Sequence, residues 1–226
     1  QTYQNIEYII VDGASKDNTM MIINKYRNQI AKIIVEPDNS MYEAINKGIR
    51  VATGDYIMVI NSDDYLASND TIQSIVNFIE KNPGCLAYYG NILTLNSNKL
   101  LKRKVFKVNK NQLLSTRHCT LIPHPSLIVH RQKSLSSVGY YNLEYKYASD
   151  FDYVFRHLDH GAVKYMNKYT TVFRVHPESI TSSGKLNKER LHILANYSGY
   201  SSRLLNALNY VFIWSLYKII NISINR

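Results

Sequence analysis

The chain has 226 residues, of which 45% are hydrophobic and 19% charged, so it is suited to one folded α/β domain and is not a disordered chain. The formal net charge of +10 favours an anionic partner, but the sequence contains no zinc-finger spacing, RNA-recognition aromatic motif or helix-turn-helix signal, so we expect no nucleic acid partner. Two cysteines, Cys85 and Cys119, are too few for a disulfide framework and favour a reducing compartment.

Short apolar runs alternate with helical patterns through the first 95 residues. The apolar periods and the turn residues that end them predict strands at 6–11, 33–36, 56–60 and 86–89, and helices at about 20–28, 41–52 and 71–81. This order predicts an α/β fold with a mainly parallel sheet flanked by helices. Ligands bind such sheets at the carboxyl ends of the strands, where Asp12 and the pair Asp63-Asp64 stand.

The pattern is looser beyond residue 95. We expect a loop, a short strand and a loop over 117–138, a helix over 147–159, a strand over 169–175 and two C-terminal helices, the last from about 203 to 224. That last segment is strongly apolar but contains Asn and Lys residues. It favours a helix that lies in a membrane interface or packs on the domain or on a partner, rather than one that spans a bilayer.

Carboxylates follow two of the predicted strands. The sequence Asn61-Ser62-Asp63-Asp64 could hold a hard divalent cation, which would neutralise a diphosphate and stabilise it as a leaving group. A polar turn capped by Asp64 is the alternative. At the end of the first strand, Asp12 could accept a hydrogen bond from a nucleobase or a ribose hydroxyl, and Gly13 permits a close backbone approach.

A third acidic motif, Ala148-Ser149-Asp150-Phe151-Asp152, stands at the start of a predicted helix. A carboxylate fixed there could act as a general base and take the proton of an acceptor hydroxyl. The alternative is an ordinary helix cap.

These motifs, in this order and at these separations, resemble family 2 glycosyltransferases, which have the GT-A fold. The sequence Asn61–Asp64 is similar to that family's DXD motif, and residues 1–19 and 41–57 are similar to the segments before it. On the acceptor side the resemblance rests on His124-Pro125-Ser126, Gly139-Tyr140-Tyr141 and Ser149–Asp152. The resemblance covers about residues 1–180 and places the family's first strand before Gln1, so we expect a GT-A sheet whose first strand is missing.

The resemblance implies a role for each matching position. Asp63 and Asp64 are expected to bind Mn²⁺ or Mg²⁺ and the donor, with His176 near the metal or diphosphate. Asp150 is expected to be the catalytic base, with Asp152 as its rival, and His124 to lie on the acceptor side. The expected donor-binding residues are Asp12, which would contact the uracil, Gly13, Ser15, Asp38, Asn46, Lys47, Asn61 and Asp63.

The chain departs from the family pattern at a few positions. Asn61 replaces the first Asp of the DXD form. Ile45 stands where many relatives carry an Arg toward the diphosphate, and Lys47 or the cation is expected to compensate. We expect a glycosyltransferase domain over 1–185, divided into a nucleotide-sugar half over 1–95 and an acceptor half over 96–185, followed by a C-terminal helical tail over 186–226.

The resemblance implies transfer of a sugar, with inversion of the anomeric centre, from a nucleotide diphosphate sugar to a hydroxyl of a glycan or lipid-linked acceptor. A UDP-sugar is the first candidate donor, and bacterial cell-envelope polysaccharide synthesis is the expected pathway. The enzyme is expected in the cytoplasm, in peripheral contact with the inner face of the plasma membrane through residues 203–226. Two alternatives stay open: a truncated, inactive remnant that only binds nucleotide, and a nucleotidyltransferase. The latter should carry an early Gly-rich loop with Lys or Arg, which the sequence does not contain.

Overall fold

The structure is a computed structural model that describes residues 1–96, 99–105, 107–110, 122–175 and 185–197. In chain order its strands and helices are β1 (Ile9–Asp12), α1 (Thr19–Lys25), β2 (Lys32–Val35), α2 (Met41–Val51), β3 (Tyr56–Met58), β4 (Tyr65–Leu66), α3 (Thr71–Lys81), β5 (Ala87–Asn96), β6 (Lys99–Arg103), β7 (Leu127–His130), α5 (Arg131–Ser137), α6 (Ser149–His160), β8 (Val163–Val175) and α7 (Lys185–Tyr197). Short 3₁₀ turns occur at Arg27–Gln29 and His124–Ser126.

The strands form two sheets. β1 and β2 pair in parallel, and the larger sheet has the order β3-β7-β5-β8-β4 with β6 paired to β5. β5 and β8 are parallel, whereas β7 runs antiparallel to both of its neighbours. The expected α/β fold with flanking helices is therefore confirmed, but the larger sheet is mixed rather than mainly parallel. A short connection such as that between β5 and β6 can join only antiparallel strands.

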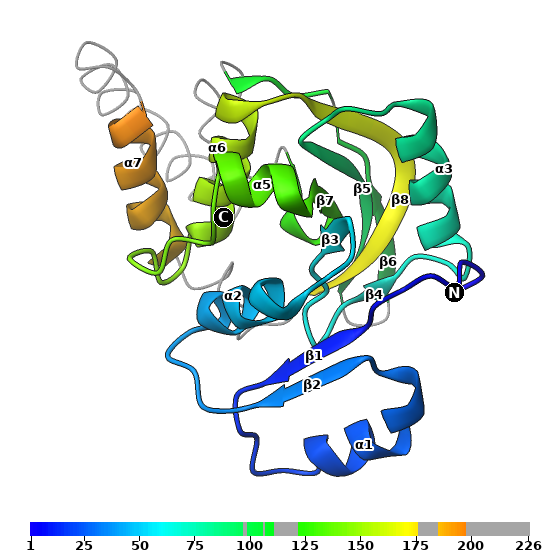
Figure 1. Ribbon diagram of the computed structural model, residues 1–226. Coiled ribbons are helices and arrows are strands. Elements are labelled where there is room, and N and C mark those ends of the chain that lie inside the picture. The colour runs from blue at the N-terminus through cyan, green and yellow to red at the C-terminus, as the bar shows by residue number, and fades with distance from the viewer. Residues whose placement is uncertain (97–98, 106, 111–121, 176–184, 198–226) are drawn as a thin grey trace, which may run out of the picture.

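Apolar side chains form a core on each face of the larger sheet. Because neighbouring residues of a strand point to opposite faces, Tyr88 packs with Ile75 and Ile79 of α3, whereas Tyr89 belongs to the core that contains Phe151 and Phe155 of α6. Figure 1 shows α3 on one side of the sheet and α5 and α6 on the other. The motif predicted after β3 therefore follows a strand of this sheet, and the motif at the start of α6 belongs to a helix that packs on one of its faces.

The first helices and strands follow the sequence pattern closely. α2 and α3 begin at the predicted residues, and the side chain of Ser40 caps α2 by accepting from the backbone N–H of Glu43. Three predictions were wrong in detail: β5 continues to Asn96, β8 begins at Val163, and α5 replaces an expected loop. β5 and β8 pair from Ala87–Val163 to Asn96–Val175, and this long-range pairing extends both strands beyond their local apolar runs.

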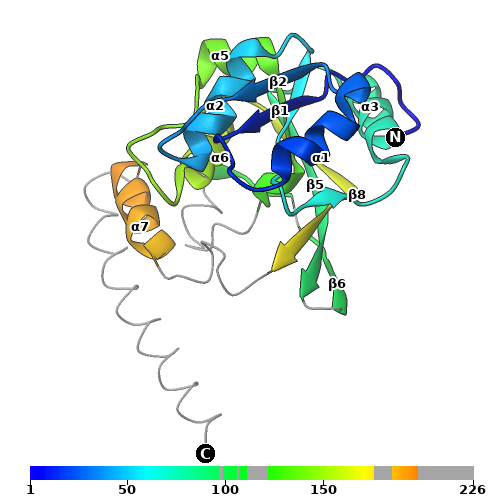
Figure 2. The same cartoon turned by 90° about the horizontal axis from the view of Figure 1, so that it is seen from below.

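The helix α7 belongs to the folded domain. Its residues Leu186, Ile193 and Leu194 are 6%, 0% and 2% exposed and lie in the core beside α6. Figures 1 and 2 both show α7 next to α6, and Figure 2 also shows the hairpin of β5 and β6 projecting from the body. The boundary expected after residue 185 stays a prediction, while α7 packs against α6. The helix predicted at 203–224 lies outside the described residues, and none of the described helices is long and apolar enough to cross a membrane.

Glu7 ties the chain before β1 to two other segments. Its carboxylate accepts hydrogen bonds from Lys32 Nζ at 2.8 Å and from the backbone N–H groups of Thr53 and Gly54 at 2.6 and 3.1 Å. The Lys32 ammonium, followed by the Thr53 N–H, lowers the pKa of Glu7 from 4.5 to about 2. These donors favour the charged carboxylate, so the contact between the first sheet and the α2–β3 turn is strongest while Glu7 is ionised.

We predict a pH-dependent loss of stability on Glu7→Gln. A carboxyl whose pKa is lower in the folded state stabilises the fold above its ordinary pKa, and this contribution is lost as the pH falls toward about 2. In urea unfolding, the variant should therefore be less stable than the original protein at neutral pH, and the difference should shrink at about pH 3. A difference in unfolding free energy that is the same at both pH values would contradict this assignment.

Candidate active site

Asp12 ends β1 and is held by its own turn. Its two carboxylate oxygens accept from the backbone N–H of Ser15 at 2.8 Å and from Ser15 Oγ at 2.6 Å, and the side chain is only 7% exposed. Between them Ala14 has a φ of 64°, a left-handed conformation that is unfavourable for a residue other than glycine. The two hydrogen bonds offset this cost and fix the direction of the Asp12 carboxylate.

The loops after β1 and β2 lie against each other. A Cβ atom on Gly13 would come within 2.8 Å of Asp38 Oδ2, so a side chain there would displace Asp38. Lys47 of α2 donates to the carbonyl of Pro37 at 2.7 Å and lies 3.3 Å from a carboxylate oxygen of Glu36. Five of the predicted donor-binding residues are therefore gathered at the carboxyl ends of the two parallel strands: Asp12, Gly13, Ser15, Asp38 and Lys47.

The predicted metal motif follows β3 and is attached to β8. Asp64 is 8% exposed; its Oδ2 accepts from Asn61 Nδ2 at 2.8 Å and its Oδ1 from the backbone N–H of Arg174 at 2.9 Å. Burial raises the pKa of Asp64, and the charge of Asp63 acts in the same direction, while both hydrogen bonds oppose the shift. The buried carboxylate is thus a group that a neighbouring cation would stabilise in its charged form.

This donor set fits Mn²⁺ or Mg²⁺. Within the part of the chain that the structure describes, no group of three or more His, Cys, Asp or Glu side chains is arranged to hold a metal ion. Two neighbouring carboxylates nevertheless suit a hard cation that takes its other ligands from water and a diphosphate. His176 lies outside the described residues. Arg174, two residues earlier in the chain, donates its backbone N–H to Asp64.

The structure distinguishes the two carboxylates of α6. Asp152 is 3% exposed, and its oxygens are occupied by Arg156 Nε at 2.8 Å and by the hydroxyl of Tyr197 at 3.0 Å. Asp150 is half-buried, and both of its hydrogen bonds to described residues, from Tyr42 Oη at 3.1 Å and from the Phe151 N–H at 2.8 Å, go to Oδ1. Oδ2 of Asp150 is therefore the oxygen placed to accept a proton.

His124 lies near this carboxylate. Its Nε2 is 2.7 Å from the hydroxyl of Tyr141, whose ring stacks on Tyr42 and Tyr153. Burial lowers the pKa of His124, and the charge of Asp150 opposes the shift. The structure thus brings together the carboxylate predicted to be the base and the histidine predicted for the acceptor side, and both roles stay predictions.

Asn46 has contacts other than those expected from the sequence. It is 1% exposed, its Nδ2 donates to the carbonyl of Tyr141 at 2.9 Å, and its Oδ1 accepts from the Tyr141 N–H at 2.9 Å. The side chain therefore joins α2 to the segment that leads into α6, and a donor contact stays a prediction. Tyr42 and Glu189 also hold that segment. The sequence indicated neither contact, because no local pattern marks contacts between residues so far apart.

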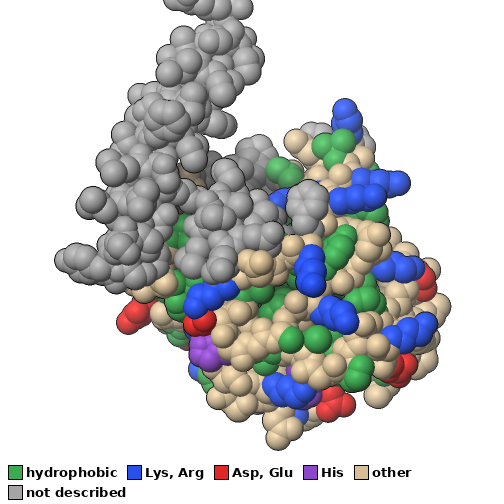
Figure 3. All heavy atoms as spheres, turned by 90° about the horizontal axis from the view of Figure 1, so that it is seen from above, with side chains coloured by type: hydrophobic (Ala, Val, Ile, Leu, Met, Phe, Trp, Pro, Cys, Tyr) green, Lys and Arg blue, Asp and Glu red, His purple; other side chains and the backbone are tan. Residues whose placement is uncertain are grey.

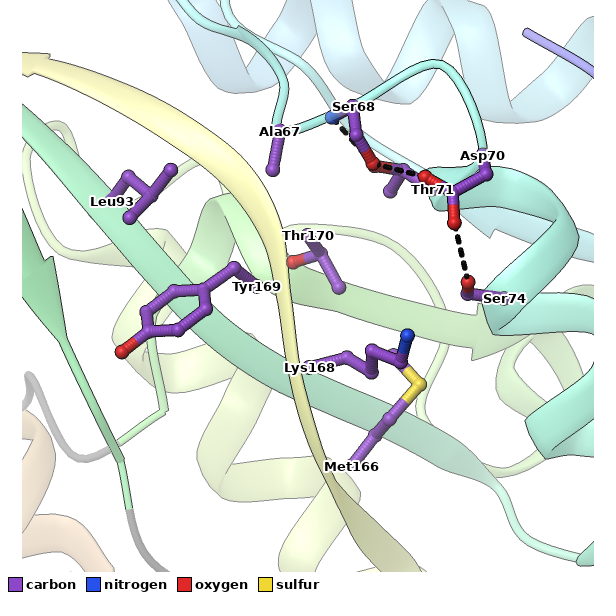
Figure 4. Close-up of a pocket in the computed structure, with 10 residues that line it drawn as sticks. All are labelled: Ala67, Ser68, Asp70, Thr71, Ser74, Leu93, Met166, Lys168, Tyr169 and Thr170. Atoms are coloured by element: carbon purple, nitrogen blue, oxygen red, sulfur yellow. Dashed lines mark hydrogen bonds between the residues drawn. The ribbon is translucent and has the colours of Figure 1, made fainter.

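Two surface features lie apart from these residues. On the face seen in Figure 3, the Lys and Arg side chains of the described residues are scattered among apolar and other side chains rather than joined in one stripe. A hollow of about 270 Å³ lies between the start of α3 and β8 (Figure 4). Its lining consists of Ala67, Ser68, Asp70, Thr71, Ser74, Leu93, Met166, Lys168, Tyr169 and Thr170, and contains none of the predicted site residues.

Comparison with known proteins assigns the family. The family model described as glycosyl transferase family 2 matches residues 1–137. The chain therefore belongs to glycosyl transferase family 2. It is 28% identical over 178 residues, 74% of its length, to a Mycobacterium tuberculosis protein named PGL/p-HBAD biosynthesis glycosyltransferase, and it spans 64% of that protein's length.

Solved structures of similar fold support the same architecture. S. aureus TarS in complex with UDP-GlcNAc is similar over 84% of this chain and 56% of that one, with a TM-score of 0.67 and 18% identity. The mannosyltransferase PcManGT from Pyrobaculum calidifontis, in complex with GDP-Man and Mn²⁺, is similar over 91% of this chain and 70% of that one, with a TM-score of 0.55 and 15% identity. The expected GT-A-type fold is confirmed.

We predict that Asn46→Ala destabilises the protein. The change would leave the N–H and the C=O of Tyr141 without the partners they have now, at a cost of about 2 to 4 kcal/mol in unfolding free energy. Urea unfolding measures the loss, and Asn77→Ala on the exposed face of α3 is the matched control, with an expected change within about 0.5 kcal/mol. Equal stability of the two variants would show that this link is not important.

Proposed function

We propose that this protein is an inverting glycosyltransferase that moves a sugar from a nucleotide diphosphate sugar to a hydroxyl of a glycan or glycolipid. The observation that carries the proposal is Asp150: a carboxylate at the start of α6, with one oxygen held by Tyr42 and the other directed to no described partner, beside His124. Within a family of glycosyltransferases, such a group suits a general base.

The donor would bind at the carboxyl ends of the strands. Asp12 would accept a hydrogen bond from the uracil, and Ser15 keeps its carboxylate in place. Gly13 lets the donor approach the backbone, with Asp38 beside it. A UDP-sugar is the first candidate donor, supported by the structural similarity to a protein solved with UDP-GlcNAc. Because another similar protein was solved with GDP-Man, sugars of other nucleotides should be tested as well.

Asp63 and Asp64 would hold Mn²⁺ or Mg²⁺ against the diphosphate, with His176 as a further candidate ligand. A bound cation would neutralise charge that develops on the diphosphate as it leaves. Asn61 and the backbone of Arg174 keep the Asp64 carboxylate in one orientation for this purpose. The similarity to a mannosyltransferase solved with Mn²⁺ supports the choice of metal.

The reaction then needs only a proton acceptor and correct positioning. Asp150 Oδ2 takes the proton of the acceptor hydroxyl while the hydroxyl oxygen attacks the anomeric carbon. The bond from that carbon to the diphosphate oxygen breaks, and its electron pair leaves with the nucleoside diphosphate. Because attack and departure are on opposite sides, the anomeric configuration inverts without a covalent enzyme intermediate.

The proposed acceptor class follows from a named relative. The mycobacterial relative is named for PGL/p-HBAD biosynthesis, which supports a glycolipid or envelope glycan as the class of acceptor for this chain. A lipid-linked acceptor would suit an enzyme on the cytoplasmic side of the plasma membrane, in contact with it through residues 203–226. Vesicle binding by the full chain would test that contact.

We predict metal-dependent release of nucleoside diphosphate from a panel of UDP-, GDP- and dTDP-sugars with Mn²⁺. Asp150→Asn should lower kcat about 10²- to 10⁴-fold because the base is lost, and Asp64→Ala should abolish the metal-dependent release because a ligand of the cation is lost. Asp70→Asn is the matched control, because Asp70 also stands at the start of a helix but lies in the hollow beside α3, and it should leave kcat unchanged.

Each other outcome has a distinct meaning. Turnover with GDP- or dTDP-sugars alone would support the proposed reaction but contradict the proposed contact between Asp12 and uracil. Absence of turnover with every donor would contradict the proposed function, and nucleotide binding still detected by calorimetry would then favour an inactive remnant that only binds nucleotide. Release of pyrophosphate from nucleoside triphosphates would instead favour a nucleotidyltransferase.

A further inference from the structure

A carboxylate from α7 holds the segment that leads into α6. Glu189 Oε1 accepts from the backbone N–H of Lys146 at 3.0 Å, and Oε2 accepts from those of Tyr147 and Ala148 at 2.7 and 2.8 Å. Ala148 stands at the N-cap position of α6, where its methyl side chain cannot accept a hydrogen bond. Glu189 therefore gathers three successive N–H groups at the start of the helix, which a negative charge satisfies well.

Glu189 is placed by a rigid helix. Ile193 and Leu194 of α7 are almost fully buried in the core beside α6, and Tyr197 of the same helix donates to Asp152 in the first turn of α6. α7 thus contacts the start of α6 at two points along its length, and Figures 1 and 2 show the two helices side by side. A carboxylate on such a helix fixes its partners more firmly than one on a free loop would.

Tyr42 of α2 holds the same segment from another direction. Its hydroxyl lies 3.1 Å from the carbonyl oxygen of Tyr147 and 3.1 Å from Asp150 Oδ1. The peptide groups of Tyr147 are therefore held by Glu189 at the N–H and by Tyr42 at the C=O, and the single O–H proton of Tyr42 is shared between that C=O and the carboxylate of the proposed base. A shift of this segment would move the Asp150 carboxylate with it.

We propose that Glu189 is a positioning residue for the base, so that α7 is part of the machinery of the reaction. This inference rests on the proposed function of Asp150. The residue lies well beyond residues 1–137, which the family model matches. An ordinary stabilising helix cap would make the same hydrogen bonds, and it differs from a positioning residue in one measurable way: its effect on the rate would not depend on the presence of Asp150.

The test is a double-mutant cycle in the full chain. Glu189→Ala should lower kcat about 10- to 100-fold, because a misplacement of about 1 Å can cost that much, while the affinity for UDP, measured by calorimetry, stays within about twofold. Glu189→Gln should lose less, because its one carbonyl oxygen can still accept from Tyr147 and Ala148. In the Asp150→Asn background, Glu189→Ala should cause no further loss, since both changes act through the same carboxylate. Glu80→Gln on the exposed surface of α3 is the control.

Other results would overturn the inference. A folded Glu189→Ala variant with the original kcat would do so, as would a loss that is undiminished in the Asp150→Asn background, or an equal loss of UDP affinity. If Glu189→Ala does not fold, Glu189→Gln and its double variant decide in the same way. An original chain that transfers no sugar from any donor would overturn the proposed function and this inference together, whereas an active chain with unaffected variants would overturn the role of Glu189 alone.

Discussion

The pair of hydrogen bonds between Asn46 and the backbone of Tyr141 is the constraint on which the site depends. Asn46 comes from α2, which follows the loops after β1 and β2, whereas Tyr141 lies in the segment that leads to Asp150. A buried amide that uses both its donor and its acceptor on one backbone unit defines a single position for it. That position in turn sets the stack of Tyr141 on Tyr42 and the contact between its hydroxyl and His124.

The segment between α5 and α6 has no regular secondary structure, yet side chains from three helices satisfy its backbone groups. Asn46 of α2 and Glu189 of α7 hold it at two places, and Arg156 of α6 donates to the carbonyl of Tyr140 at 2.9 Å and to that of Val138. Buried polar networks rigidify a structure when every member has its partner. A loop held in this way can place a carboxylate as firmly as a regular element can, which general base catalysis requires.

The sequence predicted the chemical groups better than it predicted their supports. Strand ends, caps and helical periods are local signals, and they located α2, α3, Asp12, Asp64 and Asp150 correctly in the fold. Asn46 bonds to a residue 95 positions further along the chain, and Glu189 to one 42 positions before it. No local pattern encodes such contacts. The unexpected length of β5 and β8 has the same reason, because the pairing of distant strands determines it. The difference between Asp150 and Asp152 also depends on distant contacts, since Arg156 and Tyr197 of α7 occupy the oxygens of Asp152.

We have proposed that the carboxylates after β1 and β3 and Asp150 of α6 serve one donor and one acceptor. A crystal structure of the protein with UDP and Mn²⁺ tests this most directly, because the anomalous scattering of manganese identifies the metal without ambiguity. The account predicts a manganese peak in contact with the Asp63 and Asp64 carboxylates, with the uracil beside Asp12 and Asp150 facing the diphosphate. Nucleotide or metal bound elsewhere, for example in the hollow between α3 and β8, would contradict it.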